Sequence, residues 1–325
     1  MWITDYLQLM FPEDLNKINK KQAMALKQKN IPKALYKYRS VDEYSIKNLR
    51  NDVMRFNPAN KMNDPYDSAL TLNKKVYREV AKNELVNHLP QIMEKFNINM
   101  TENELNDIKR KGFFDIYRFV LSHISELTED EESLIRVADQ RYSSLVEDLD
   151  NRIKGLVELT QKLVHISCFS EKNDSMLMWS HYTNNHKGFC LEYNFIKSDN
   201  ILFNPVISET LHPVIYRDEL FDIAKYIETE RLVGEEYLMY IIAYAAMIKS
   251  TEWSYEREWR LIEIPYQEVD GLNLPFFLPE SIYLGARIND EDKKMLIEIG
   301  TEKKIPVFQM KMKDDTFKLI SERVL

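Results

Sequence analysis

Hydrophobic and polar residues follow two different periods along this chain. Apolar side chains alternate with polar ones in residues 52–58 and 188–193, which predicts strands that place one face toward a core. Further segments with strand-like composition lie at 34–40, 163–171, 212–219, 251–264, 281–285 and 306–312. Because these strands are scattered among helices without a regular strand–helix repeat, we expect an α+β fold with a mixed, mostly antiparallel sheet core.

Helical spacing dominates the remaining segments. Residues 1–30 are expected to form an N-terminal helical segment, and Pro32 ends it because proline disfavours helical backbone in the preceding residue. Glu, Lys, Leu and Ile recur at helical spacing from about 74 to 162, which predicts three to five helices. We therefore expect one α+β domain over 31–325 with a large helical insertion at about 74–162. Further helices are expected at 174–185, 218–250 and 289–300.

Composition narrows the function classes. The chain has 325 residues with 44% hydrophobic content, enough for a sizeable core, but only 7 Gly, and it contains no Gly-rich phosphate-loop motif. A net charge of −8 disfavours nucleic acid as a partner. Two cysteines far apart indicate free thiols in a reducing compartment. No apolar run reaches the ~18 residues of a membrane span. We expect a soluble, cytoplasmic protein with no membrane partner.

Residues 167–190 concentrate chemically active side chains. One of the 4 Trp and two of the 6 His of the chain lie here, beside serines and tyrosines. On a helix capped by Asp174, Trp179 would pack on the sheet, while His181 and Tyr182 would face a cleft together with Ser170 of the preceding strand. A structural histidine is the alternative interpretation of His181. The zinc patterns HExxH and CxxC are absent, so no metal is expected here.

The segment Glu252 to Arg260 contains closely spaced carboxylates. If it is extended, Glu256 and Glu258 share one face, and Trp259 lies on the other. Two nearby carboxylates raise the pKa of one of them, which suits general acid–base catalysis. The alternative is an ordinary solvent-exposed face of an antiparallel strand.

Two further sites are candidates for ligand binding. Tyr38 and Arg39 end the first expected strand, where the donor fork of an arginine can hold a phosphate or carboxylate. A structural ion pair of Arg39 is the alternative. Asp64 and Asp67 in the sequence NDPYD can either bind Mg²⁺ or bond their own turn.

A series of short motifs resembles a bacterial family of unknown function, DUF2971. In chain order these are LYKYRS, NDPYD, CFSE, MWSHY, HKGFCLEY, VIY and YEREWR. They extend from about 34 to 312 apart from the helical insertion. The resemblance implies an association with phage-defence or mobile-element genes.

A second resemblance is to ADP-ribosyltransferases of the Arg–Ser–Glu type. Arg39, then Ser167 or Ser170, then Glu256 and Glu258 occur in the order of that family's motifs, although its Ser-Thr-Ser is missing. The resemblance implies that Arg39 holds the phosphates of NAD⁺ and Ser170 positions the nicotinamide ribose. Glu258 would stabilise the positive charge that develops as nicotinamide leaves.

Three functions therefore remain open. The first is a defence or toxin-type effector that consumes NAD as a substrate, with His181, Glu256 and Glu258 as catalytic residues and a nucleotide bound by Tyr38, Arg39, Ser170 and Tyr182. The second is a metal-dependent nuclease or phosphoesterase with Mg²⁺ bound by the two aspartates of NDPYD and the two glutamates. The third is a non-catalytic ligand-sensing or protein-interaction module, with a protein partner on the helical insertion.

Overall fold

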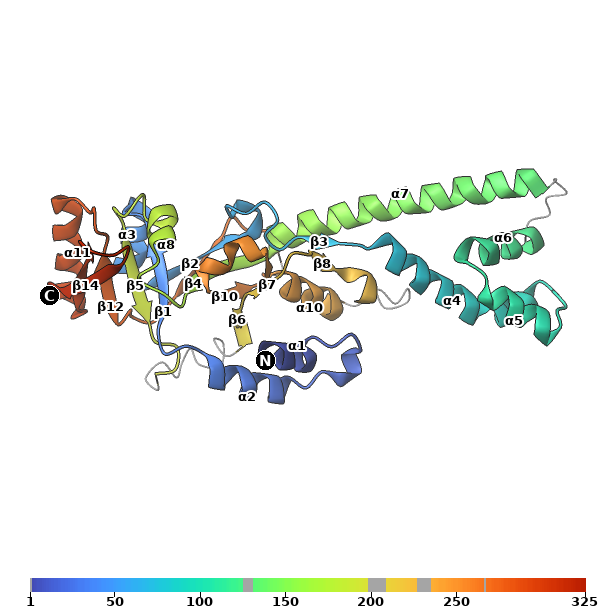
Figure 1. The fold of residues 1–325 in the computed structure, drawn as a ribbon, viewed down its shortest axis with the longest axis horizontal. Helices are drawn as coiled ribbons and strands as arrows, with labels where there is room; N and C mark the ends of the chain where they lie inside the picture. The colour runs from blue at the N-terminus through green and yellow to red at the C-terminus, as the bar shows by residue number, and fades with distance from the viewer. Residues whose placement is uncertain (1, 125–130, 198–208, 227–234, 266) are drawn as a thin grey trace. The chain divides into compact units, whose positions relative to one another are not determined.

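The computed structural model describes residues 2–124, 131–197, 209–226, 235–265 and 267–325 (Figure 1). These residues form two compact units. Unit 1 consists of Met1–Ser68, Thr160–Glu219 and Ile242–Leu325, and unit 2 consists of Ala69–Leu159 and Leu220–Ile241. The predicted insertion at about 74–162 lies almost entirely in unit 2. The N-terminal helices belong to unit 1 together with the sheet.

Unit 1 is built on a 10-stranded sheet with the path β11-β2-β4-β1-β5-β12-β13-β14, to which β10 and β6 add beside β4. Its strands are β1 (Leu35–Arg39), β2 (Val53–Pro58), β4 (His165–Ser170), β5 (Phe189–Tyr193), β6 (Leu211–Pro213), β10 (Glu258–Glu263), β11 (Leu272–Pro275), β12 (Ser281–Leu284), β13 (Val307–Met312) and β14 (Leu319–Arg323). The strands pair antiparallel except for β12 and β13, which pair parallel. The predicted α+β class with a mixed, mostly antiparallel sheet is confirmed.

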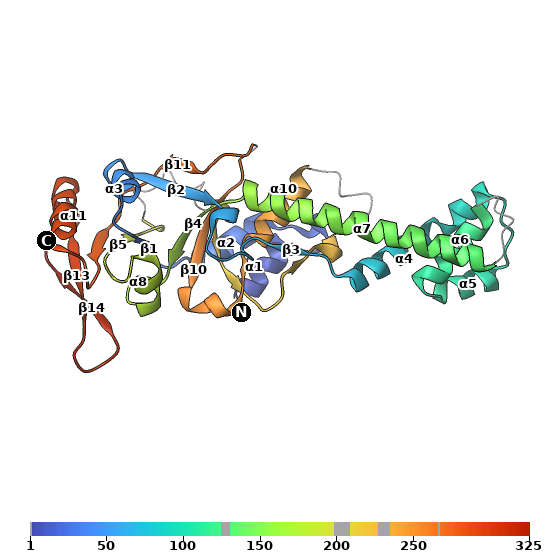
Figure 2. The ribbon, with the colours of Figure 1, turned by 90° about the horizontal axis from the view of Figure 1, so that it is seen from above.

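Helices flank this sheet in unit 1. They are α1 (Trp2–Met10), α2 (Lys20–Asn30), α3 (Glu43–Arg50), α8 (Met176–Tyr182) and α11 (Asp290–Lys303), with short 3₁₀ turns at Leu15–Lys17 and Ala59–Lys61. Helix α11 lies alongside β13 and β14 near the C-terminus (Figure 2). A separate parallel pair joins β7 (Ile215–Tyr216) to β9 (Ile248–Lys249), and α10 (Glu235–Ala245) precedes β9.

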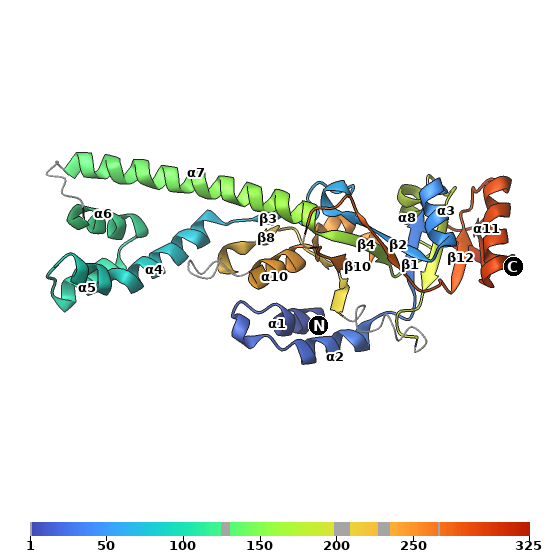
Figure 3. The same cartoon turned by 180° about the vertical axis from the view of Figure 1, so that it is seen from behind.

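Unit 2 is helical, as the spacing of its residues predicts. It contains α4 (Lys74–Lys95), α5 (Glu102–Arg110), α6 (Phe113–Ile124) and most of α7 (Glu131–Leu163), which is one continuous helix (Figure 3). Leu89, Ile108, Ile116 and Val120 form its core. A short parallel pair, β3 (Leu70–Thr71) and β8 (Phe221–Asp222), is followed by the 3₁₀ turn Ile223–Tyr226.

The chain leaves and re-enters unit 1 at two points that are held together. The Gln161 side-chain amide donates to the carbonyl oxygens of Asp67 at 3.0 Å and of Pro65 at 3.3 Å. The two ends of the long excursion through residues 69–159 are therefore fixed to each other by hydrogen bonds within unit 1.

Two predictions of local structure were wrong. The helix of residues 174–185 begins after Ser175, whose hydroxyl accepts from the Met178 amide, so Ser175 and not Asp174 is the N-cap. Residues 251–264 are not one strand. Thr251–Glu256 forms a 3₁₀ helix capped by Ser250, and Arg257 then adopts the left-handed region with φ 45°, so that β10 begins only at Glu258. The Ser250 cap, worth about 1 kcal/mol, favours the 3₁₀ helix over the expected strand in residues 251–256.

The loop after α8 fixes β5 against β1. Asn184, Asn185 and His186 all have positive φ, a conformation that asparagine tolerates better than most residues. Gly188 follows, and a Cβ atom there would lie 2.1 Å from the carbonyl oxygen of Arg39. Only glycine allows this close approach, which sets the backbone position of Arg39.

The N-terminal helices contact the sheet through buried polar groups. Lys27 of α2 is fully buried, and its ammonium nitrogen donates to the Leu211 carbonyl oxygen of β6 at 2.7 Å. The Tyr6 hydroxyl lies 2.9 Å from Nδ1 of His212, which is also on β6. Burial lowers the pKa of Lys27 to about 7, because a charged ammonium is poorly solvated there.

Removing this buried amine should stabilise the protein. The unfolded chain binds a proton at Lys27 up to about pH 10, whereas the folded chain releases it near pH 7. Wild-type stability should therefore rise as pH increases through this window. Lys27→Met is expected to raise the free energy of unfolding near pH 7 by roughly 2–4 kcal/mol and to flatten its pH dependence.

Chemical denaturation at several pH values measures both effects. Lys29→Met, an exposed position on the same helix, is the matched control and should leave the pH dependence unchanged. An equal pH slope in wild type and Lys27→Met would contradict the expectation.

Candidate functional site

A pocket lies where the sheet of unit 1 splits. On one edge β4 pairs with β1 only at Ser170–Tyr36 and with β2 only at Ile166–Asn57 and His165–Pro58. Within the described residues, no strand pairs with this edge of β4 between these two points. The other edge of β4 pairs with β10 along its whole length. The gap between β1 and β2 therefore opens a cavity of about 150 Å³ beside β4.

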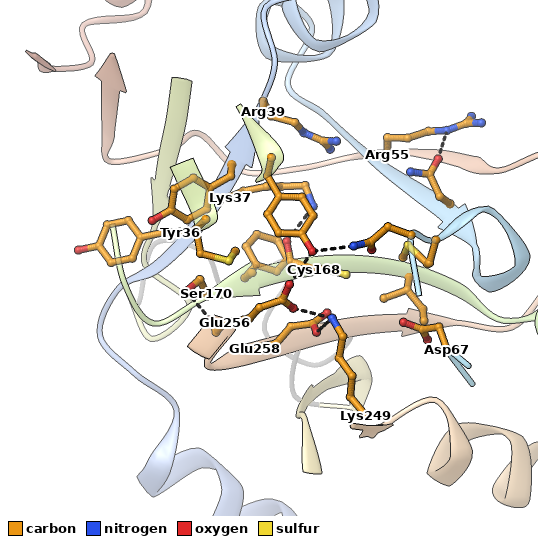
Figure 4. A pocket seen from close by; sticks show the side chains of 18 residues that line it. Tyr36, Lys37, Arg39, Arg55, Asp67, Cys168, Ser170, Lys249, Glu256 and Glu258 are labelled. Carbon is orange, nitrogen blue, oxygen red and sulfur yellow. Dashed lines mark hydrogen bonds and ion pairs between the residues drawn. The ribbon is translucent and has the colours of Figure 1, made fainter. Parts of the chain in front are cut away.

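Side chains and backbone from several elements line this pocket (Figure 4). They come from β1, β2, the NDPYD turn and the residue before it, β4, α8, β9, the 3₁₀ helix Thr251–Glu256 and the start of β10. The lining residues are Tyr36, Lys37, Tyr38, Arg39, Arg55, Asn57, Met62, Asn63, Asp67, Ile166, Cys168, Phe169, Ser170, Met178, Tyr182, Lys249, Glu256 and Glu258.

Two arginines give the pocket a basic side. Arg39 ends β1 and is partly buried, and its guanidinium forms no hydrogen bond or ion pair with any residue that the structure describes. Arg55 of β2 donates from Nε to Asn57 Oδ1 at 3.1 Å and from Nη2 to the Asp270 carbonyl oxygen at 2.6 Å. The expected alternative, a structural ion pair of Arg39, is not observed among these residues. Arg39 is thus available to bind an anion.

Glu256 lies on the opposite side of the pocket (Figure 4). It is 2% exposed, and its carboxylate accepts from the Tyr182 hydroxyl at 2.5 Å and from Lys249 Nζ at 2.5 Å. Burial, with the adjacent charge of Glu258, raises the pKa of Glu256 above the ordinary value of a glutamate. A carboxylate that takes up a proton closer to neutral pH is suited to general acid–base catalysis.

Glu258 is fully engaged by cations. Arg260 donates from Nε to Oε1 at 2.9 Å and from Nη2 to Oε2 at 3.2 Å, and Lys249 donates to Oε2 at 2.9 Å. Burial opposes ionisation of Glu258, but these two cations outweigh it and lower the pKa of the carboxyl. Arg260 also binds both oxygens of Asp67 at 2.8 Å and the Ala246 carbonyl oxygen at 2.7 Å.

These contacts form a buried network of Asp67, Glu256, Glu258, Lys249 and Arg260. With all five ionised it carries one excess negative charge, which explains why the weakest acid in it, Glu256, has the raised pKa. The network joins the NDPYD turn, β9, the 3₁₀ helix Thr251–Glu256 and β10, and four of its members line the pocket.

The structure brings most of the predicted site residues to this pocket, in different roles. Tyr38 is buried and donates to the Lys172 carbonyl oxygen at 2.7 Å. The Ser170 hydroxyl donates to the Glu256 carbonyl oxygen at 2.6 Å and accepts from the Lys172 amide at 3.1 Å. Both side chains thereby fix local backbone, and Arg39, Tyr182 and Glu256 are the predicted residues that present functional groups.

Two predicted residues lie outside the lining. His181 is exposed on α8, and its ring packs near Tyr182 and Tyr255. Asp64 is buried, and its carboxylate accepts from the Tyr66 amide at 2.9 Å, which is the turn-satisfying alternative. Neither side chain faces the cavity.

Sequence reasoning missed three basic residues of the pocket, Lys37, Arg55 and Lys249. Lys37 lies two positions before Arg39 on the same strand face, so the alternation that placed Arg39 could also have placed Lys37. No sequence pattern marks Lys249, because β9 has only two residues.

The carboxylates here are poorly disposed toward metal binding. Within the described ranges, no three His, Cys, Asp or Glu side chains group in a way that could hold a metal ion. Asp67 and Glu258 direct their oxygens to Arg260 and Lys249 instead.

Comparison with known proteins gives one match. The family model described as "Protein of unknown function (DUF2971)" matches residues 178–261, which include Tyr182, Lys249, Glu256 and Glu258 of the pocket. This match supports the resemblance to that family. No curated protein and no solved structure matches the chain, so the resemblance to ADP-ribosyltransferases gains no support. No helix among the described residues is long and apolar enough to cross a membrane.

Removing one cation from the buried network should destabilise the protein. Arg260→Leu would leave Asp67 and Glu258 without their shared guanidinium in a site that excludes water. We expect a loss of about 3–5 kcal/mol in the free energy of unfolding, because an uncompensated buried charge is costly.

Chemical denaturation provides the measurement. Arg287→Leu, at an exposed position of the same unit, is the control and should change stability by less than about 0.5 kcal/mol. If Arg260→Leu lost no more than this control, Asp67 and Glu258 would not depend on the Arg260 guanidinium for charge compensation.

Proposed function

We propose that this pocket binds a phosphate-bearing nucleotide and that the protein is an NAD-consuming enzyme of the ADP-ribosyltransferase or glycohydrolase type. The observation that carries the proposal is that the Arg39 guanidinium lines the pocket and contacts no acceptor among the described residues. A partly buried guanidinium that binds no described acceptor can exchange water for the oxygens of an anionic ligand. Phosphate oxygens match its planar donors.

The two sides of the pocket carry opposite charges, which favours a ligand that is anionic at one end and cationic at the other. Arg39 and Arg55 lie on one side, and Glu256 lies on the other (Figure 4). In NAD⁺ the pyrophosphate is anionic and the nicotinamide ring is cationic, so the dinucleotide has the required polarity. The cavity of about 150 Å³ is smaller than the ~300–1,000 Å³ of sites that enclose a whole drug-sized ligand. It would enclose one ring and its ribose, and the rest of the ligand would lie outside.

In this proposal the catalytic carboxylate is Glu256 rather than Glu258. Glu258 is contacted by two cations, Arg260 and Lys249, which lower the pKa of its carboxyl and make it the poorer base. Both carboxylates line the pocket, but Glu256 contacts one cation, Lys249, and has the raised pKa. As nicotinamide leaves, its C–N bond electrons remain on the ring, and ionised Glu256 would stabilise the positive ribose and accept the proton of the incoming hydroxyl. His181 is exposed and has no role in this scheme.

A metal-dependent nuclease is less consistent with these contacts. Binding Mg²⁺ at Asp67 or Glu258 would require breaking the bidentate contacts to Arg260.

The proposal includes a role as a bacterial defence or toxin-type effector. This role was inferred from the resemblance to the DUF2971 family, and the family match over residues 178–261 agrees with that resemblance.

Nicotinamide release from NAD⁺ tests the proposal. Glu256→Gln is expected to lower the rate by at least about 100-fold, because it removes the general base. Arg39→Met should raise KM by about 10- to 100-fold, the loss of one charge-assisted phosphate contact. Glu252→Gln and Arg287→Met, both exposed, are the matched controls and should behave as wild type.

Other outcomes separate the competing functions. NAD⁺ binding that depends on Arg39, measured by calorimetry without nicotinamide release, would indicate a ligand-sensing module. Cleavage of nucleic acid that requires Mg²⁺ would support the nuclease. If the wild-type protein neither binds NAD⁺ nor releases nicotinamide from it, the proposed function is refuted.

The pH profile of the reaction should report Glu256. Tyr182 donates to its carboxylate and so stabilises the ionised form. Tyr182→Phe removes this donor, so the pKa of Glu256 should increase further. We expect the acidic limb of kcat/KM to move upward by about one pH unit, since a hydrogen bond to a charged group is worth about 1.5–3 kcal/mol. Tyr44→Phe, at a 79% exposed tyrosine, should leave the limb in place. A downward or absent shift would contradict the role of Glu256.

A further inference from the structure

Lys37 is a buried amine in the pocket that the proposed reaction does not use. Its Nζ donates to Ser167 Oγ at 2.7 Å and to the Cys168 carbonyl oxygen at 2.9 Å. These acceptors lie on the part of β4 where strand pairing is interrupted, so the side chain of Lys37 bridges the split in the sheet. The Phe169 ring lies 4.8 Å from the same nitrogen.

The partners of Lys37 are neutral. No carboxylate among the described residues forms an ion pair with it, and Arg39, on the same strand face two residues away, adds positive charge. Lys249 across the pocket contrasts with it, because two carboxylates contact Lys249. Burial, reinforced by Arg39, lowers the pKa of Lys37 well below its ordinary range.

A neutral amine at this position keeps an unshared electron pair on Nζ. Two of the four tetrahedral directions at Nζ point to Ser167 and Cys168, and a third is the bond to Cε. The fourth direction holds the lone pair, and Lys37 lines the cavity. A neutral lysine amine is a nucleophile for carbonyl groups.

We propose that Lys37 forms an imine with a phosphate-bearing aldehyde, such as the open-chain form of a sugar phosphate, whose phosphate binds Arg39. The nitrogen lone pair attacks the carbonyl carbon and forms the C–N bond. The carbonyl oxygen leaves as water with the two amine hydrogens. When the imine nitrogen is protonated, the N–H that this proton forms can donate to Ser167 or Cys168.

This inference rests on the anion-binding role of Arg39 that belongs to the proposed function, but not on cleavage of NAD⁺. A phosphorylated sugar with a free aldehyde is also the chemical class of product that hydrolysis of the nicotinamide bond would give. Lys37 would then hold that product, or a related aldehyde supplied from outside, in the same pocket.

Reductive trapping tests the proposal. Wild-type protein is incubated with pyridoxal 5′-phosphate near pH 7.5, reduced with borohydride, digested and mapped by mass spectrometry. We expect Lys37 to be labelled on the order of 100-fold faster than exposed lysines, since a lysine of ordinary pKa is neutral in only about one molecule in a thousand at that pH. Pyridoxal, which lacks the phosphate, should label Lys37 about 10-fold more slowly, and Arg39→Met should remove this difference.

Two variants keep the test independent of folding. Lys37→Arg retains a cation and hydrogen-bond donors but cannot form an imine, so it should lose labelling at this position while thermal unfolding remains cooperative. Lys187→Arg, at an exposed position, should leave labelling of Lys37 unchanged. The proposal is overturned if surface lysines are labelled while Lys37 is not, or if Lys37 reacts no faster than Lys187. Labelling of Lys37 without nicotinamide release would retain this inference and reject the proposed function.

Discussion

The edge of β4 that faces β1 and β2 is the constraint on which the pocket depends. One strand edge can pair fully with only one neighbour, but here two strands share it, each at one end. The backbone between these ends would be unsatisfied in a dry core. Lys37 supplies a donor to the Cys168 carbonyl oxygen, and the cavity occupies the remaining gap. The interrupted pairing of β4 thus both opens the cavity and positions Lys37 in it.

Three buried lysines show how neighbours decide the state of one side-chain type. Lys249 contacts two carboxylates, which raise its pKa despite burial. Lys27 and Lys37 donate only to neutral oxygens, and burial lowers the pKa of both. Unit 1 therefore holds a fixed cation within its buried network and two amines that release their proton readily. The protonation of these three buried lysines is therefore set by the groups that each of them contacts.

The sequence could predict the parts of this structure that depend on local patterns. Alternation located β2 and β5, helical spacing located α4 to α7, and the short apolar runs located β1, β4, β12 and β13. It failed at 251–264, where Ser250 capping and the left-handed Arg257 interrupt an alternating pattern. Glu256 and Glu258 still meet at Lys249, because the backbone turn at Arg257 brings both carboxylates to the same amine. The engagement of Glu258 by Arg260 and the exposure of His181 depend on tertiary packing, which no spacing reveals.

The hydrogen bonds from Gln161 to Asp67 and Pro65 have a consequence for how this architecture can vary. They close the long excursion through residues 69–159 within unit 1 itself, so the position of Asp67 beneath the pocket does not depend on what that excursion contains. Loop-closure entropy grows only slowly with length, by about 0.6 kcal/mol for each doubling. The helical unit is therefore a module that proteins with this sheet could lengthen, shorten or exchange while retaining the same pocket.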